Sequence, residues 1–334
     1  MYEYDKRVVL TLDAGGTNFV FSAIQGNNEM ISPIGLPAVS DNLDECLEVL
    51  VKGFDRVIAA IPVPPVAISF AFPGPADYEN GIIGDLPNFP SFRGGVALGP
   101  FLKHKYGIPV FIENDGNLFA YGEALSGALP MINRELSLAG CSREYKNLIG
   151  ITLGTGFGAG VVINKVLLTG DNGCGGDIWL MRNKKYPDML AEESVSIRAV
   201  RRVYSDLSGQ SSASLSPKDI YDIAEGIKEG DSHAAIASFN ELGIMAGAAI
   251  ASVLNVVDGL VVIGGGVAGA SKYILPALIT ELRAQLTTFS GNKFPCVSMQ
   301  VYNGEDESER ARFLSLSDSQ VVIPGTHLTD RKSV

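Results

Sequence analysis

The amino-acid sequence predicts an α/β protein that is built from two similar lobes. A pattern of one apolar run, a Gly/Thr turn and a second apolar run occurs twice, from Val8 to Ile24 and from Leu148 to Ile163. Apolar β-branched runs on both sides of a short glycine turn are typical of β-hairpins. Predicted strands and helices alternate in both halves, as in the α/β class. A chain of 334 residues is long enough for two sizeable cores.

The other elements follow from hydrophobic periodicity. After the first hairpin, the pattern predicts a helix, a short strand, a helix, a buried strand and a helix, over residues 42–54, 66–72, 98–106, 109–113 and 118–126. After the second, it predicts helices over residues 192–207, 218–229, 232–257 and 273–286, and strands over 259–263 and about 296–302. We expect an N-terminal lobe at residues 1–118, a C-terminal lobe at 119–302 and a further C-terminal segment at 303–334.

Charge and cysteine content narrow the classes of function. The net charge of −11 and the pI of about 4.8 disfavour nucleic acid or an anionic membrane as the partner. The four cysteines are far apart and form no CxxC pair, so a reducing compartment is expected. The N-terminal segment MYEYDKRVVL is too polar for a signal peptide, and no apolar run approaches transmembrane length. We therefore expect a cytoplasmic protein.

The two glycine turns are candidate phosphate-binding sites. Glycines let a ligand approach the backbone, threonines add hydroxyl donors, and a turn that presents N–H groups can hold an anion. Asp13, at the end of the first strand, is placed to hold Mg²⁺ through water. The candidate residues are Asp13, Gly15, Gly16, Thr17 and Asn18 in the first turn, and Gly154, Thr155 and Gly156 in the second.

Two alternatives to this interpretation of the glycine turns are an ordinary hairpin turn and a P-loop. Each turn could be an ordinary hairpin turn, because Asp and Gly are common there. Two unrelated hairpins, however, rarely share the same order of apolar run, Gly/Thr turn and apolar run. A P-loop NTPase is excluded as far as motifs allow, because GxxxxGK[ST] does not occur.

A third group of candidate residues, Glu113, Asn114 and Asp115 with Asn117, follows the strand PVFIE. In open α/β sheets, ligands bind at the carboxyl ends of the strands. A single carboxylate there could accept a hydroxyl proton during phosphoryl transfer. Alternatively, Asn114 or Asp115 could cap the next helix, and the two roles can coexist on different residues.

A fourth segment, LVVIGGGVA, places Gly264, Gly265 and Gly266 after a buried strand. It also matches GxGxxG through Gly264, Gly266 and Gly269, which opens the alternative of an NAD-dependent oxidoreductase. That fingerprint requires an acidic residue at the end of the next strand. The strand predicted at about 296–302 has none before Gly304. Nucleotide binding without dinucleotide specificity is therefore favoured.

The four segments LTLDAGGTN, PVFIENDGN, ITLGTGFGAGVVI and LVVIGGGVA, in this order, resemble the sugar kinases of the ROK family. The resemblance runs from Val8 to Leu286. It implies the two-lobed actin/hexokinase-like (ribonuclease H-like) fold with a cleft between the lobes, in which the two hairpins bind phosphate and the Gly264–Gly266 turn approaches the adenosine. It further implies that Asp115 is the general base and that Asn114 and Asn88, in LPNFPSF, bind sugar hydroxyls.

The stretch GCGGDIWLMRNKKYPDMLAEESVSIRA departs from the family pattern. Family members usually carry an acidic–Gly–His segment here, and then a cysteine-rich zinc loop that ends in a sugar-binding glutamate. Asp177 can replace the acid, but Ile178 and Trp179 stand where Gly and His are expected, and Trp179 could instead stack on a sugar. Cys174 is isolated, so no zinc is expected. Glu192, followed by Glu193, is the candidate for the glutamate.

The residues and the resemblance together predict an ATP-dependent sugar kinase with an alcohol acceptor, similar to glucokinases. Asp115 would take the proton from a hydroxyl of a hexose or related sugar, and the two hairpins would hold Mg-ATP. We expect a homodimer that binds neither nucleic acid nor membrane. The alternatives are a catalytically silent sugar sensor of the same fold, which the segment around Trp179 favours, and the NAD-dependent oxidoreductase. A carboxylate kinase is disfavoured, because no motif supplies arginines for its transition state.

Overall fold

The computed structural model describes residues 2–15, 17–72, 74, 76–84, 89–315, 319–322 and 329–332. Its contacts divide the chain into two compact units. Unit 1 comprises Met1–Ser126 with Thr169–Gly175, and unit 2 comprises Gly127–Leu168 with Gly176–Val334. The division follows the end of helix α3 (Asp115–Leu125), because that helix continues unbroken past residue 118. The assignment of residues 1–118, 119–302 and 303–334 as functional lobes and a tail stays a prediction.

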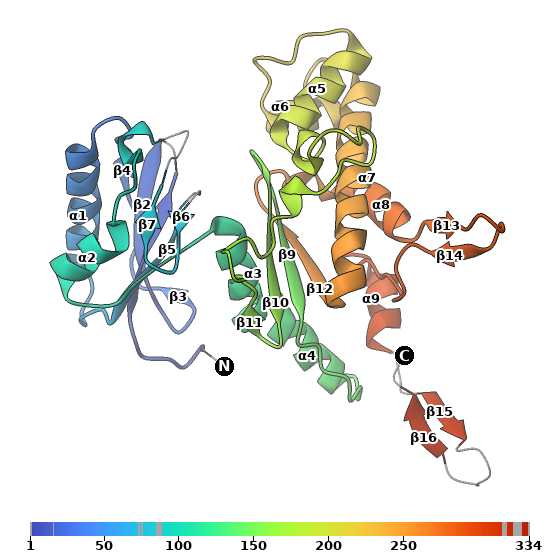
Figure 1. Cartoon of the computed structure of the whole chain (residues 1–334), viewed down its shortest axis with the longest axis horizontal. Coiled ribbons are helices and arrows are strands. Elements are labelled where there is room, and N and C mark those ends of the chain that lie inside the picture. The colour runs from blue at the N-terminus through green and yellow to red at the C-terminus, as the bar shows by residue number, and fades with distance from the viewer. Residues whose placement is uncertain are drawn as a thin grey trace. The chain divides into compact units, whose positions relative to one another are not determined.

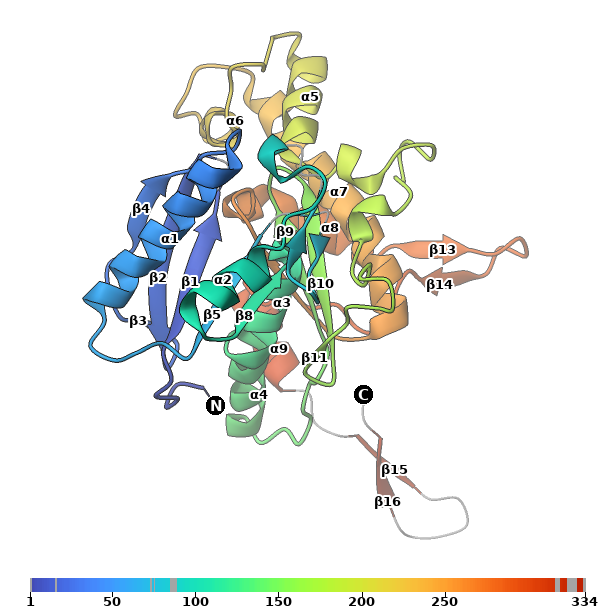
Figure 2. The same cartoon turned by 60° about the vertical axis from the view of Figure 1, so that its left-hand side comes forward.

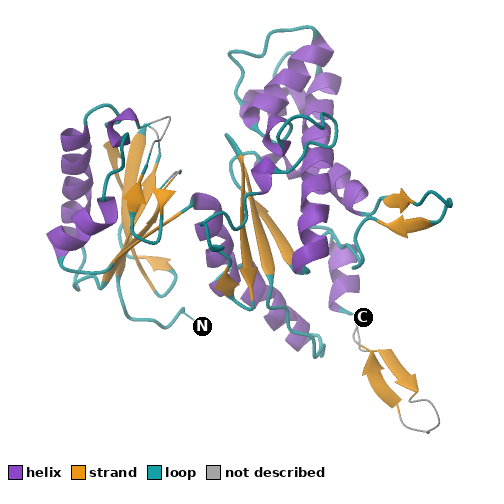
Figure 3. Cartoon of the chain, in the orientation of Figure 1, coloured by secondary structure: helices purple, strands orange, loops and turns teal. Residues whose placement is uncertain are grey.

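Unit 1 is built on a mixed six-stranded sheet (Figures 1 and 3). Its order is β3-β2-β1-β5-β8, with β4 paired to β2. The first predicted hairpin is confirmed, since β1 and β2 pair antiparallel, and β1, β5 and β8 run parallel. The strands are β1 (Val9–Ala14), β2 (Asn18–Gln25), β3 (Asn28–Glu29), β4 (Ile34–Pro37), β5 (Ala67–Ala71) and β8 (Val110–Glu113), and a separate short ladder joins β6 (Ala76–Asp77) to β7 (Ile82–Ile83).

Aromatic side chains fill the core of unit 1. Helix α1 (Leu43–Ala60) begins where the Asn42 side chain accepts the N–H of Glu45, and it buries Leu50, Phe54 and Val57. Phe54 packs edge-on against Phe21 of β2, with ring centroids 5.1 Å apart. Burying rings of this size supplies much of a core's hydrophobic stabilisation. The remaining helices of the unit are η1 (Pro90–Phe92), α2 (Leu98–Tyr106) and α3.

Unit 2 repeats the same strand arrangement with a four-stranded sheet, ordered β11-β10-β9-β12. The second predicted hairpin, β9 (Leu148–Leu153) with β10 (Phe157–Ile163), is confirmed. As in unit 1, the first strand of the hairpin pairs in parallel with a later strand, here β12 (Leu260–Gly264). The other elements are β11 (Val166–Leu167), α4 (Ala128–Leu138), η2 (Ile178–Leu180), η3 (Ala191–Glu193), α5 (Ile197–Ser208), α6 (Pro217–Ala224), α7 (Ser232–Val257), η4 (Ala268–Ala270) and α8 (Ser271–Leu282).

Helix α7 forms the centre of unit 2 and packs closely on α8. A Cβ at Gly243 would lie 2.4 Å from the carbonyl oxygen of Ile274, and a Cβ at Gly247 would lie 3.0 Å from that of Leu278. The small residues of α7 therefore serve a contact within the unit. By length and composition α7 could cross a membrane, so the expectation that no apolar run approaches that length was wrong. Of its most apolar window, 56% is buried inside the protein, as in the core helix of a soluble protein.

The chain after α8 first forms a projecting hairpin and then packs back onto unit 2. Strands β13 (Gln285–Thr287) and β14 (Lys293–Pro295) extend away from the helices (Figure 2). The strand predicted at 296–302 does not form. Its backbone instead bonds to other parts of the unit: Cys296 N–H donates to the Ala284 carbonyl at 2.7 Å, and Arg283 Nη2 donates to the Val301 carbonyl at 2.7 Å.

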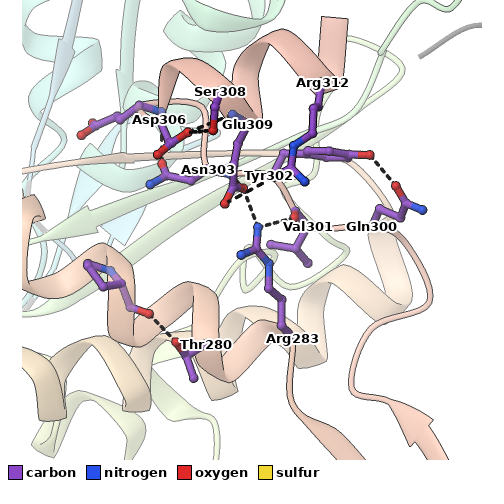
Figure 4. Close-up of polar contacts among 12 residues, drawn as sticks. Thr280, Arg283, Gln300, Val301, Tyr302, Asn303, Asp306, Ser308, Glu309 and Arg312 are labelled. Atoms are coloured by element: carbon purple, nitrogen blue, oxygen red, sulfur yellow. Dashed lines mark hydrogen bonds and ion pairs between the residues drawn. The ribbon is translucent and has the colours of Figure 1, made fainter. Parts of the chain in front are cut away.

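Helix α9 (Glu307–Leu314) is fixed by charged contacts (Figure 4). Glu309 pairs with Arg283 and also accepts the N–H of Asn303 at 2.8 Å. Arg310 reaches α4, where its Nη2 donates to both carboxylate oxygens of Glu135 at 2.6 and 2.8 Å. Beyond α9, β15 (Ser319–Val322) and β16 (Thr329–Lys332) form a further two-stranded ladder.

The contact between α7 and α8 predicts that Gly243→Ala lowers the free energy of unfolding by about 1–3 kcal/mol, because backbone atoms of α8 occupy the space that the methyl group needs. Gly122→Ala in α3 is the matched control, since a Cβ there has nothing within 4 Å. It is expected to be neutral or to stabilise the helix by up to about 1 kcal/mol. Urea unfolding followed by circular dichroism compares the two variants. Equal effects would contradict the close contact.

Candidate functional site

The register of the unit 1 sheet brings two groups of predicted site residues to one edge. Asp13 of β1 pairs with Ala71 of β5, and Ala71 pairs with Glu113 of β8. These three residues form a row at the carboxyl ends of three parallel strands. Because neighbouring strands lie about 4.8 Å apart, the backbones of Asp13 and Glu113 are separated by about 10 Å. The β1–β2 turn and Asp115, which follows Glu113 by two positions, thus share this edge.

The first turn is closely packed at its glycine. A Cβ at Gly15 would lie 2.9 Å from the carbonyl oxygen of Asn18, while Asp13, Thr17 and Asn18 are exposed. Gly15 keeps a φ outside the left-handed region, so this position requires glycine for close approach rather than for a positive φ. Two predicted residues of unit 1, Gly16 and Asn88, lie outside the described residues.

At the end of β8, the capping role considered for this segment falls on Asn114. The Asn114 side chain caps α3, because its Oδ1 accepts the N–H groups of Gly116 at 2.9 Å and of Asn117 at 3.3 Å. Asp115 is the first residue of the helix and is exposed. Its carboxylate accepts the Gly116 N–H at 2.8 Å. The helix cap therefore leaves the Asp115 carboxylate at the surface.

Asn117 is a polar residue of this site to which the sequence assigned no role. It is 93% buried and donates from Nδ2 to Glu113 Oε1 at 3.1 Å. Its Oδ1 is buried without a hydrogen-bond partner among the described residues. A buried acceptor without a partner costs free energy, so the described contacts compensate the burial of Asn117 only in part.

In unit 2, the second turn and the Gly264–Gly266 turn also share an edge. Thr152 of β9 pairs with Gly264 of β12, and the Val267 N–H donates to the Leu153 carbonyl at 3.0 Å. Gly265 has a φ of +90°, and a Cβ there would lie 2.4 Å from the Leu153 carbonyl oxygen. Glycine is thus required at 265 both by conformation and by space.

The carboxylate of Glu192 lies on the second turn. Its Oε2 accepts the N–H of Phe157 at 3.1 Å, and a Cβ at Gly156 would lie 2.5 Å from the same oxygen. The start of α5 is bonded to the turn as well, because the Ile197 N–H donates to the Gly154 carbonyl at 2.9 Å. The candidate glutamate and the candidate phosphate turn are therefore neighbours, which no local pattern in the sequence indicated.

The segment that leads to Glu192 is organised by Asn183, which is 2% exposed. Its Nδ2 donates to the Leu190 carbonyl at 3.1 Å and to Ser194 Oγ at 2.8 Å. Its Oδ1 accepts the N–H groups of Lys185 and Tyr186, both at 3.0 Å. One buried amide thus closes the loop and fixes η3, where Glu192 lies.

Of the other residues predicted in this segment, Asp177 is exposed just before η2, and Trp179 is partly buried against the core of unit 2. Among the described residues, no group of three or more His, Cys, Asp and Glu side chains is arranged to hold a metal ion. The predicted absence of zinc stays a prediction.

The arrangement of strands defines the class of protein. In each unit a hairpin with a glycine turn is joined through its first strand to a parallel strand that ends at the same edge. This is the actin/hexokinase-like α/β fold. The crystal structure of a ROK family glucokinase from Streptomyces griseus, in complex with glucose and AMPPNP, has this fold and matches with a TM-score of 0.62 at 20% identity, covering 83% of this chain and 88% of that chain.

The model of the ROK family matches residues 9–308, and the chain therefore belongs to the ROK family. The crystal structure of a glucokinase from Parabacteroides distasonis is 59% identical, with a TM-score of 0.89, and the match covers 100% of this chain and 91% of that one. A glucokinase of Thermotoga maritima is 26% identical over 82% of this chain and 86% of its own length. A xylose repressor of Bacillus subtilis is 24% identical over 74% of this chain and 61% of its own length.

The contact between Glu192 and the second turn predicts different effects for its two glycines. In Gly156→Ala, the new methyl group displaces Glu192 Oε2, and the Phe157 amide loses its acceptor. In Gly154→Ala, the methyl group meets nothing within 4 Å. Amide proton spectra of the ¹⁵N-labelled protein are expected to show an upfield shift of the Phe157 signal in Gly156→Ala alone. The same shift in both variants would contradict the assigned contact.

Proposed function

We propose that the protein transfers the γ-phosphoryl group of ATP to a hydroxyl of a hexose or related sugar. The single observation that carries this proposal is the row from Asp13 to Glu113, which brings a glycine turn and the exposed Asp115 carboxylate to one sheet edge. A phosphate-binding turn and a base at the same edge are the parts that phosphoryl transfer to a hydroxyl requires. The 59% identity to a glucokinase over the whole chain supports the same reaction class.

In this proposal Asp115 accepts the proton of the sugar hydroxyl while the hydroxyl oxygen attacks the γ-phosphorus in line, and ADP leaves. We assign sugar hydroxyls to Asn88, Asn114, Asp177, Glu192 and Glu193. The turns at residues 13–18 and 154–156 are assigned to the phosphates, and Gly264–Gly266 to the adenosine. The side-chain nitrogen of Asn114 takes no part in the helix cap, because Oδ1 accepts both of the capping bonds.

Mg²⁺ fits the residues of the first turn. Mg²⁺ keeps several of its waters and is commonly bound by one or two carboxylates together with substrate phosphates. Asp13 supplies one exposed carboxylate next to the turn. When bound, the ion would neutralise charge on the phosphates. The cytoplasmic location and the homodimer stay predictions.

A sugar panel tests the proposed reaction. ADP formation is coupled to a spectrophotometric readout with glucose, N-acetyl amino sugars, fructose and allose as acceptors. We expect at least one sugar to stimulate ATP consumption. If none does while a sugar still binds in calorimetry, the protein is a silent sensor, the alternative that the match to a repressor keeps open. Calorimetry with ATP and NAD separates the kinase from the oxidoreductase.

Asp115→Asn is expected to keep sugar binding and to reduce phosphoryl transfer by several orders of magnitude, since the amide cannot accept the hydroxyl proton. Asp44→Asn, the same change at an exposed position in the first turn of α1, is the matched control and should retain wild-type turnover. Steady-state kinetics with the best sugar of the panel gives kcat, and calorimetry gives the sugar affinity. Near-normal turnover in Asp115→Asn would refute the assignment of Asp115 as the base.

A further inference from the structure

Arg198 connects the start of α5 to Glu192. Its Nη2 donates to Glu192 Oε1 at 3.1 Å and to Glu193 Oε1 at 3.1 Å. The other oxygen of Glu192 accepts the Phe157 N–H, so the carboxylate is held at both of its oxygens. One guanidinium thus fixes the carboxylate that lies on the second turn.

Of the two glutamates, Glu192 is the one that the structure orients. Its side chain is 22% exposed, against 48% for Glu193, and Glu192 alone has the additional contact with Phe157. A carboxylate offers roughly four acceptor sites on its two oxygens. Arg198 and Phe157 take one each, which leaves acceptor capacity for hydroxyl groups of a ligand.

We propose that Arg198 is a positioning residue that holds the Glu192 carboxylate in the orientation in which it accepts sugar hydroxyls. This inference rests on the proposed function, because it assigns Glu192 to the sugar. Arg198 is not assigned any contact with a substrate. Its role is to neutralise and orient two adjacent carboxylates, of which one faces the phosphate turn.

The charges of this cluster explain why an arginine serves here. Two neighbouring carboxylates repel each other, and a cation that donates to both removes that repulsion. The hydrogen bond that Arg198 donates to Glu192, together with the one that it donates to Glu193, outweighs the opposing effect of desolvation and raises the pKa of Arg198 above its ordinary value, so the group stays charged. Without the guanidinium, repulsion from Glu193 would turn Glu192 away from Phe157.

The first experiment measures the position of Glu192 without any substrate. Hydrogen–deuterium exchange is followed by mass spectrometry in a peptide that contains the Phe157 amide, for the wild type, Arg198→Met and Arg198→Lys. We expect faster exchange at this peptide in Arg198→Met, because Glu192 no longer protects the amide. Arg198→Lys keeps the charge but lacks the planar fork of the guanidinium. Its exchange rate at this peptide should therefore lie between those of the wild type and Arg198→Met.

The second experiment compares the effect on the KM for the sugar with the effect on the KM for ATP. With the best sugar of the panel, Arg198→Met is expected to raise the sugar KM roughly three- to fivefold, because Arg198 is about half exposed and an ion pair of this kind contributes little free energy. The KM for ATP should change less, and Arg198→Lys should recover part of the sugar affinity. A general structural defect would not produce this selective change with partial rescue by lysine.

Arg202→Met is the matched control, because Arg202 lies in the same helix and pairs with Asp206 and Glu241 rather than with Glu192. Unchanged exchange at Phe157 in Arg198→Met, or equal exchange in Arg202→Met, would overturn the positioning role. An unchanged sugar KM in Arg198→Met would overturn it as well. If the wild type phosphorylates no sugar, the proposed function fails, whereas the exchange experiment still decides whether Arg198 positions Glu192.

Discussion

The parallel pairing next to each hairpin is the constraint on which the rest of the structure depends. In a parallel pair the strands end at the same edge, so the β1–β2 turn lies at the edge where β5 and β8 end, and the β9–β10 turn lies where β12 ends. A slip of one residue would move every buried side chain of a strand to the opposite face. The core that fixes the register of β1 and β2, which includes Leu10, Leu12, Phe19 and Phe21, thereby also fixes the position of Asp13.

Features that depend on local pattern could be predicted from the sequence. Both hairpins formed where apolar runs flank a glycine turn, and the family membership followed from four ordered motifs. The two turns nevertheless differ. Ala14 pairs with Phe19 across residues 15–18, whereas Leu153 pairs with Phe157 across residues 154–156. The first turn is therefore longer than the second, and the similar composition of the two turns does not reveal this difference in length.

The segment before Glu192 could not be predicted because its order comes from side-chain contacts that leave no periodic pattern in the sequence. Lys184 pairs with Glu281 of α8 at 2.6 Å, and Lys185 pairs with Glu241 of α7 at 2.7 Å. Both lysines are about half exposed, and such pairs contribute about 0–1 kcal/mol each. The buried amide of Asn183, with all four of its bonds satisfied within the segment, is the stronger contributor to order. A side chain of this kind looks like an ordinary loop residue in the sequence.

The close packing of α7 on α8 has a consequence for the interpretation of sequence variation. At Gly243 the obstacle to a Cβ is a backbone carbonyl of α8, which no change of rotamer can move aside. Substitution there would destabilise the fold whatever reaction the protein performs. An invariant glycine at this position among related chains would therefore reflect the close packing of α7 on α8. Invariance at positions with open space around the Cβ, such as Gly154 and Gly266, would instead indicate selection by a ligand.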